Sequence, residues 1–192
     1  LQQSDPNVQS FLPEFMLVFR LLYEVSLKET SQWYPWIQSL PTTFSTGLYL
    51  DPVERSFVER GSVGRKFLQA QQIQFNTFSA MVETLLLYAK NENQTQNNPG
   101  LSCLPPELLQ YLLQLKLEAK DVDINNPVSW DNDDSMTTSD QKPKSPLDDL
   151  LRWAYTIVFT RSWRTPCGTE ANIVPLGDLF NHDSHHPNLR PY

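Results

Sequence analysis

The segment that most constrains the fold of this chain is Asn172-Ile-Val-Pro-Leu-Gly-Asp-Leu-Phe-Asn-His-Asp183. Pro175 interrupts an extended apolar run, and a proline there favours a sheet edge or an irregular turn because it has no amide proton. The apolar side chains around it still have to be buried. The segment therefore predicts buried backbone whose amide and carbonyl groups are not all paired in a sheet. A bound ligand can satisfy such groups.

Residues 175–182, Pro-Leu-Gly-Asp-Leu-Phe-Asn-His, resemble the Pro-x-x-Asp-x-x-Asn-His motif of SET-domain protein methyltransferases. The resemblance is to the subgroup typified by the RuBisCO large-subunit lysine methyltransferase, which also includes a protein-histidine methyltransferase. Two further segments match that subgroup in the same order along the chain. An isolated Asn-His pair would carry no weight, whereas three ordered matches predict this family.

The first further match is Trp153-Ala-Tyr155 followed by Thr160-Arg-Ser-Trp163, which is similar to a helix of the subgroup with a Trp-Ala and Ser-Arg-x-Phe pattern. Arg161 precedes Asp178 with the spacing that the subgroup has between its Arg and its Asp. The second is the segment 31–41, Ser-Gln-Trp-Tyr-Pro-Trp-Ile-Gln-Ser-Leu-Pro. It is similar to the Tyr-Pro-Tyr-Leu-x-x-Leu-Pro signature near the start of the subgroup's helical insertion.

The resemblance implies a mainly α fragment, namely the helical insertion of a SET domain plus the start of its β-rich cofactor-binding C-terminal half. On this interpretation residues 1–117 form the helical insertion and residues 118–145 an acidic, disordered insertion. Residues 146–192 then form a helix and the Asn-His segment. In the family the first SET strands precede this region, and the catalytic Tyr and a substrate-binding domain follow it. We therefore expect an internal fragment that has no turnover by itself.

Hydrophobic periodicity predicts most of the helices directly. Apolar residues at spacings of three and four predict a helix over residues 8–27, in which Pro13 is tolerated only within the first turn. Asp51 and Glu54 flank Pro52 in a capping-box pattern that begins a short helix, which Gly61 and Gly64 end. A long helix is expected over residues 65–90, with a buried stripe that includes the following residues: Phe67, Phe75, Phe78, Val82, Leu85 and Leu86.

Two more helices follow the long one. Pro105 and Pro106 begin a helix that we expect to end at about Leu117. Ser145 and Pro146 suit the cap and the first position of a helix whose apolar stripe continues to Val158.

Extending that last stripe by three residues reaches Arg161. A guanidinium on a buried helix face needs a partner. One possibility is a salt bridge to Asp178 or Asp183; the other is a ligand that carries a carboxylate, which a guanidinium binds through two parallel hydrogen bonds. Spacing leaves both open, and the resemblance favours the ligand.

The resemblance implies that the cofactor is S-adenosyl-L-methionine, with Arg161, Asp178, Asn181 and His182 as cofactor-binding residues. The Asn181 amide can both accept from an ammonium and donate to a carboxylate. His182 is expected to use its backbone amide and carbonyl rather than act as a general base. Arg161 and Asp178 are also expected to line the substrate's site. Thr165, where some members carry a basic residue, and Gly177 depart from the subgroup.

The function that the resemblance implies is a protein-lysine N-methyltransferase, with a protein-histidine methyltransferase as the alternative. A zinc site is a rival interpretation, because His182, His185 and His186 lie close to Asp178 and Asp183. A non-catalytic helical interaction module is the third interpretation. Affinity for S-adenosylmethionine separates the module from the enzyme.

The composition of the chain disfavours several other classes of protein. A net charge of −7, with 22 acids against 15 Lys and Arg, disfavours direct nucleic-acid binding, which needs clustered cations. The two cysteines, Cys103 and Cys167, form no framework of disulfides, and no apolar run is long enough to span a membrane. We expect a monomer that acts on a protein substrate inside the cell. Cytoplasm, nucleus and chloroplast all stay open.

Overall fold

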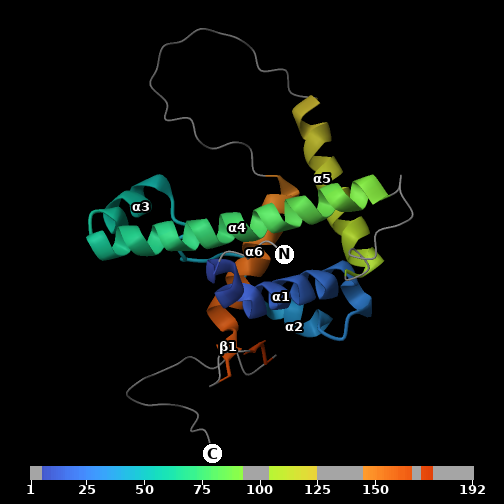
Figure 1. Ribbon diagram of the computed structural model, residues 1–192, viewed down its shortest axis with the longest axis horizontal. Coiled ribbons are helices and arrows are strands. Elements are labelled where there is room, and N and C mark those ends of the chain that lie inside the picture. Colours follow the sequence, from blue (N-terminus) through green and yellow to red (C-terminus); the bar gives the residue numbers. More distant parts are fainter. Residues whose placement is uncertain (1–5, 93–103, 125–144, 166–169, 175–192) are drawn as a thin grey trace, which may run out of the picture. The chain divides into compact units, whose positions relative to one another are not determined.

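The computed structural model describes residues 6–92, 104–124, 145–165 and 170–174. In this part of the chain the secondary structure is mainly helical, which confirms the predicted fold class. The elements in chain order are α1 (Pro6–Ser26), η1 (Lys28–Thr30), α2 (Tyr34–Ser39), α3 (Pro52–Glu59), α4 (Ser62–Glu92), α5 (Pro106–Ile124), α6 (Pro146–Arg161), β1 (Trp163–Arg164) and β2 (Ala171–Asn172) (Figure 1).

The chain divides into two compact units. The first unit comprises residues 1–78 and 153–192, and the second comprises residues 79–152. Helices α4 and α6 each contribute residues to both units. The first unit contains α1, α2, α3 and both strands, together with the predicted site residue Arg161.

The core of the first unit is formed by α1, the first half of α4 and the second half of α6. Apolar residues recur on one face of each helix at helical spacing, so each helix presents a continuous stripe to the others. The fully buried side chains are Phe15, Val18, Leu21, Leu22, Phe78, Ala154, Tyr155, Ile157 and Val158. Aromatic rings link the three helices: Phe15 lies 5.4 Å from Phe78, and Phe75 lies 5.5 Å from Tyr155, between ring centroids.

Helix α1 confirms the predicted helix but not the predicted position of its proline. The helix begins at Pro6, so Pro13 lies inside it rather than in its first turn. Pro13 cannot donate a hydrogen bond to the carbonyl of the residue four positions earlier, which disfavours a helix. The buried stripe that starts at Phe15 and Val18 lies directly after Pro13 and holds the helix in place through tertiary packing.

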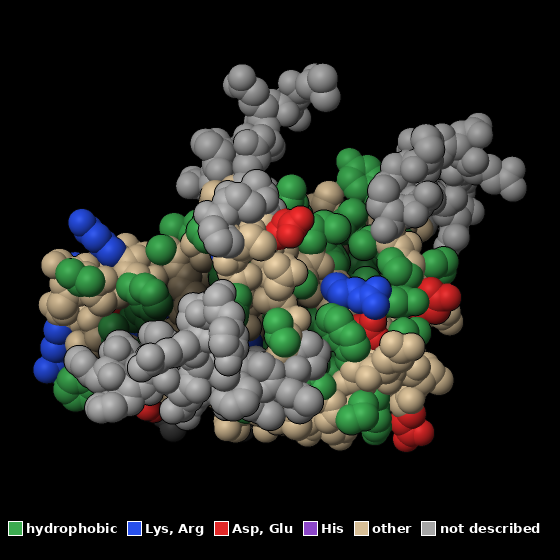
Figure 2. Space-filling view, turned by 90° about the horizontal axis from the view of Figure 1, so that it is seen from below, with side chains coloured by type: hydrophobic (Ala, Val, Ile, Leu, Met, Phe, Trp, Pro, Cys, Tyr) green, Lys and Arg blue, Asp and Glu red, His purple; other side chains and the backbone are tan. Residues whose placement is uncertain are grey.

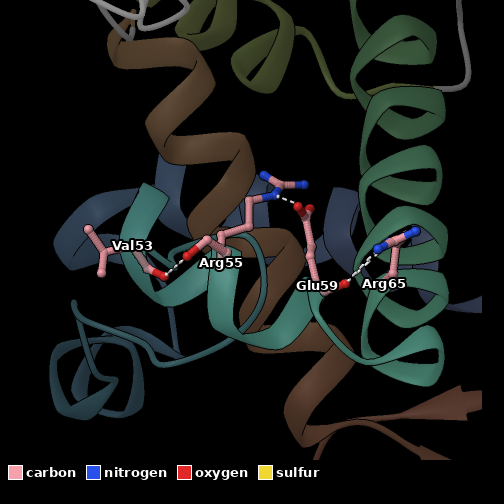
Figure 3. A network of polar contacts seen from close by, with 5 residues as sticks. Val53, Arg55, Glu59 and Arg65 are labelled. Atoms are coloured by element: carbon pink, nitrogen blue, oxygen red, sulfur yellow. Dashed lines mark hydrogen bonds and ion pairs between the residues drawn. The ribbon is translucent and has the colours of Figure 1, made fainter.

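The capping box before α3 is confirmed. The amide of Glu54 donates to Asp51 Oδ1 at 2.8 Å, and the amide of Asp51 donates to Glu54 Oε2 at 3.1 Å. Arg55 Nε donates to Glu59 Oε1 at 3.0 Å, and the Arg65 guanidinium donates twice to the Glu59 carbonyl, at 3.2 and 3.0 Å (Figure 3). These contacts hold the corner between α3 and α4.

The long helix α4 is confirmed, although it begins at Ser62, before the predicted start at residue 65. Gly64 therefore lies in its first turn rather than in a break. A Cβ added at Gly64 would stand 2.3 Å from the carbonyl oxygen of Val58, so the close approach of α3 to α4 requires glycine there.

The predicted apolar stripe of α4 is wrong at Phe67, which is 62% exposed, whereas the adjacent Leu68 is 3% exposed. The helix is rotated so that Leu68, Phe75 and Phe78 define its buried face. Phe67 joins exposed apolar side chains over the α3–α4 corner, where Lys and Arg side chains are also exposed (left side of Figure 2). Arg60 lies over the Phe57 ring there, 4.5 Å from its centroid.

The second unit contains the end of α4, helix α5 and the first half of α6. Its buried side chains are Val82, Leu86, Leu108, Leu112, Leu147 and Leu151. An ion pair joins Lys116 of α5 to Glu83 of α4. Helix α5 begins at Pro106 as predicted but continues to Ile124, past the expected end at Leu117 and into the range predicted as an acidic insertion. The rest of that insertion, residues 125–144, lies outside the described residues.

The predicted cap of α6 is confirmed, because Ser145 Oγ accepts from the amide of Asp148 at 3.1 Å. Among the helices that the structure describes, none combines the length and hydropathy that crossing a membrane requires.

Candidate functional site

Arg161 is the last residue of α6 and is partly buried. The helix ends just after it, where the amide of Ser162 donates to the Val158 carbonyl at 2.8 Å. Ala154, Ile157 and Val158 form the buried face that precedes it, as the sequence predicts, and Tyr155 is buried with them. Arg161 thus continues the buried helical stripe to the partly exposed end of α6.

The chain continues from α6 into a short antiparallel ladder. Strand β1 pairs with β2, with Trp163 opposite Asn172 and Arg164 opposite Ala171. The amide of Thr165 also donates to the Glu170 carbonyl at 3.0 Å. This register brings the start of the 172–183 segment beside the end of α6. Arg161 therefore lies two residues from a strand whose partner leads toward the Asn-His motif.

The remaining predicted cofactor residues are Asp178, Asn181 and His182. All three lie outside the described residues, so their positions relative to Arg161 stay a prediction. The predicted salt bridge from Arg161 to Asp178 or Asp183 also stays a prediction, because both acids lie outside the described residues.

Two of the three matching segments meet in the first unit. The indole N–H of Trp153, in the Trp-Ala segment of α6, donates to the carbonyl of Pro41 at 3.0 Å. Pro41 is the last residue of the 31–41 segment, which contains α2. The sequence motifs are thus joined by a direct hydrogen bond between residues far apart in the chain.

An acid on α1 holds the strand that follows Arg161. Glu14 is 4% exposed, and both of its carboxylate oxygens accept from the Arg164 guanidinium: Oε1 from Nε, and Oε2 from Nη2 at 2.7 Å. Nη2 also donates to the Ser10 carbonyl at 2.6 Å. The hydrogen bond with Glu14 raises the pKa of Arg164, so the guanidinium stays charged. We call this set of contacts between Glu14 and Arg164 the α1–β1 clamp.

Tyr155 lies on the buried face of α6, in the same unit as the α1–β1 clamp. Its hydroxyl donates to Gln74 Oε1 at 3.1 Å, and its ring stacks on Phe159 with centroids 4.1 Å apart. Burial raises the pKa of Tyr155 well above its ordinary range, and the charge of Glu14 raises it further. The phenol is therefore a neutral hydrogen-bond donor rather than a candidate proton acceptor at neutral pH.

The sequence analysis missed Glu14 and the strand pair. Glu14 falls three residues after Phe11 and four before Val18, so it stands within the apolar stripe of α1. A charge in such a stripe signals a buried partner, because acids are rarely buried without one. The strands give no comparable signal, since each is two residues long.

The residues of the predicted zinc site all lie outside the described part of the chain, so that interpretation stays untested. Groups of three His, Cys, Asp or Glu residues that could hold a metal ion are absent from the described residues. His182, His185 and His186 lie outside that part.

Comparison with known proteins gives a similarity to protein methyltransferases. Actin-histidine N-methyltransferase of Otolemur garnettii is 26% identical over 183 residues, which cover 93% of this chain and 23% of that protein. The same enzyme of Callithrix jacchus is also 26% identical over 183 residues, with the same coverage. The chain therefore spans about a quarter of the length of these curated relatives. No family model and no solved structure matches the chain.

These relatives are named for methyl transfer to histidine. Lysine specificity, which the sequence analysis put first, gains no support from them, and the histidine alternative fits them better. The similarity extends over nearly the whole chain.

Proposed function

We propose that this chain is part of a SET-type protein N-methyltransferase that uses S-adenosyl-L-methionine, with a histidine side chain as the preferred acceptor. The observation that supports this proposal most is the similarity to actin-histidine N-methyltransferases over 93% of the chain. A lysine acceptor is the alternative. A protein substrate follows from either acceptor.

The residue chemistry fits the cofactor at Arg161. A guanidinium offers only donors, in a planar fork that matches a carboxylate such as that of the cofactor's methionine group. Its position at the partly buried end of α6 limits competition from water. Asn181 and His182 are proposed to add the amide and backbone groups described above, and Asp178 to line the acceptor's site.

The cofactor supplies a methyl group on a sulfonium, which is already a good leaving group. The protein's task is then to hold donor and acceptor in line and to exclude water. A neutral imidazole or amine nitrogen attacks, so the acceptor has to lose or lack a proton. Desolvation of the acceptor's site lowers the pKa of a histidine or lysine and favours the neutral nucleophile.

The direct test is calorimetry of the intact protein with S-adenosylhomocysteine. The proposal expects saturable binding to the wild type, which Asn181→Ala weakens. A helical interaction module would bind none of this compound. Titration of the wild type with zinc separates the metal interpretation, which expects metal binding and no affinity for S-adenosylhomocysteine.

The acceptor is tested by methyl transfer from radiolabelled S-adenosylmethionine to purified actin and to a panel of histidine- and lysine-containing peptides. Hydrolysis of the labelled product and chromatography of its amino acids identify the modified residue. Labelled methylhistidine supports the preferred acceptor, whereas methyllysine alone selects the alternative.

A further inference from the structure

We infer that the α1–β1 clamp, Glu14 with Arg164, positions Arg161 for cofactor binding, so that both clamp residues are positioning residues of the methyl-transfer site. This inference rests on the proposed function. Neither residue belongs to the motifs that predicted the site.

The clamp is rigid. Both carboxylate oxygens of Glu14 accept from the Arg164 guanidinium, and the same guanidinium donates to the Ser10 carbonyl at 2.6 Å. Two parallel hydrogen bonds fix the orientation of a guanidinium as well as its distance. The Glu14 side chain is 6% exposed, so water competes little for these bonds. The Phe11 ring lies under the guanidinium carbon, with 5.9 Å to its centroid.

The clamp lies close to Arg161 along the chain. Arg164 follows Arg161 by three residues, and the backbone amide of Ser162 donates a hydrogen bond to the Val158 carbonyl of α6. Arg161 thus stands between a packed helix and a strand held by the clamp. With both sides held, the backbone of Arg161 has little freedom. The point from which its side chain extends toward a ligand is thereby restricted.

The clamp also restrains the partner strand β2. Arg164 pairs with Ala171 of β2, and β2 packs against α1. The clamp therefore fixes the strand pair, rather than a single strand, to α1. The segment that continues from β2 toward the Asn-His motif starts from this fixed point. A loosened clamp would shift the position of Arg161 and the point at which that segment leaves β2.

A structural role without positioning would be expected to lower stability and leave the intrinsic cofactor affinity of the folded protein unchanged. The test compares three single variants of the intact protein: Arg164→Lys, which keeps the charge but loses the fork, Glu14→Gln, and the control Arg55→Lys. Arg55 also donates to a glutamate, Glu59 Oε1 at 3.0 Å, but on the α3 corner and within one helix. Arg164 is 39% exposed at its side chain, so Arg164→Lys should still fold even if Glu14→Gln does not.

Affinity for S-adenosylhomocysteine is measured by calorimetry below each variant's unfolding temperature. We expect Arg164→Lys and Glu14→Gln to weaken binding by about tenfold, since small misplacements of a binding group are costly. Arg55→Lys should leave the affinity unchanged. Normal affinity in a folded Arg164→Lys protein would overturn the inference.

The decisive measurement is a double-variant comparison. If the clamp acts through Arg161, Arg164→Lys should change the affinity for S-adenosylhomocysteine by less than about twofold in an Arg161→Ala background. The reason is that the effects of substitutions at coupled residues on the binding free energy are not additive. A full additional loss would show that the clamp acts elsewhere and would reject the inference. Failure of the proposed function is separate, since the wild type itself would then not bind S-adenosylhomocysteine.

Discussion

The hydroxyl of Tyr155 on α6 donates a hydrogen bond to Gln74 Oε1 on α4, at 3.1 Å. Tyr155 is 1% exposed, and its ring stacks on Phe159. The side chain therefore combines one polar contact with a large buried apolar surface. Substitutions can separate these two contributions.

Tyr155→Phe keeps the packing and removes the hydrogen bond, so we expect it to lower the free energy of unfolding by about 1 kcal/mol. Tyr155→Ala also leaves a cavity and should cost about 3–5 kcal/mol, by analogy with other large aromatic truncations. Urea unfolding followed by circular dichroism measures both. Equal losses of unfolding free energy in the two variants would show that the buried ring contributes nothing beyond the hydrogen bond, and would contradict this prediction.

The raised pKa of Tyr155 predicts a loss of stability at alkaline pH. The folded phenol binds its proton more tightly than the unfolded one, so its contribution is fully present below the unfolded pKa of about 10. That contribution declines as the pH rises from there through the folded pKa. Unfolding midpoints measured between pH 8 and pH 11 should fall more steeply in the wild type than in Tyr155→Phe.

Asp51→Ala removes one half of the capping box of α3. The variant should lose about 1 kcal/mol of stability, because the amide of Glu54 is left without its side-chain acceptor. Glu54→Gln is the matched control, since glutamine serves at this position of a capping box. Thermal unfolding of the two variants checks this. A loss with Glu54→Gln as large as with Asp51→Ala would argue against the cap.

Gly64→Ala should destabilise the protein by about 1–3 kcal/mol, although alanine is normally the better helix former. The reason is that its Cβ would meet the Val58 backbone oxygen at 2.3 Å, where no flexible side chain can yield. Gly61→Ala is the control, because its Cβ would have its nearest neighbour at 3.8 Å. Denaturant midpoints of the two variants should differ clearly, with Gly61→Ala close to the wild type.

Arg161→Ala in the intact protein tests the proposed cofactor contact. We expect a loss of S-adenosylhomocysteine affinity of about tenfold or more, since hydrogen bonds to charged groups contribute about 1.5–3 kcal/mol. The unfolding temperature should change little. If the variant unfolds readily while the folded fraction binds normally, the salt-bridge interpretation of Arg161 is right instead.

Local sequence rules predicted the helices and several of their ends. Capping residues satisfy amides within one turn, so Asp51, Ser145 and the prolines that follow them mark helix starts without tertiary information. The rotation of α4 was harder to predict. Phe67 and Leu68 are adjacent and both apolar, and only the packing partners decided that Leu68 is buried.

For the candidate site, the sequence by itself determined Arg161 as the end of a buried helical stripe, because helical periodicity is a local property. Only the tertiary structure decided that Glu14, far away in the chain, holds Arg164, and that Trp153 binds the Pro41 carbonyl. Such pairs depend on how separate helices pack, and no local pattern encodes the partner of a buried charge. The same reason explains why the short strand pair beside Arg161 appeared only in three dimensions.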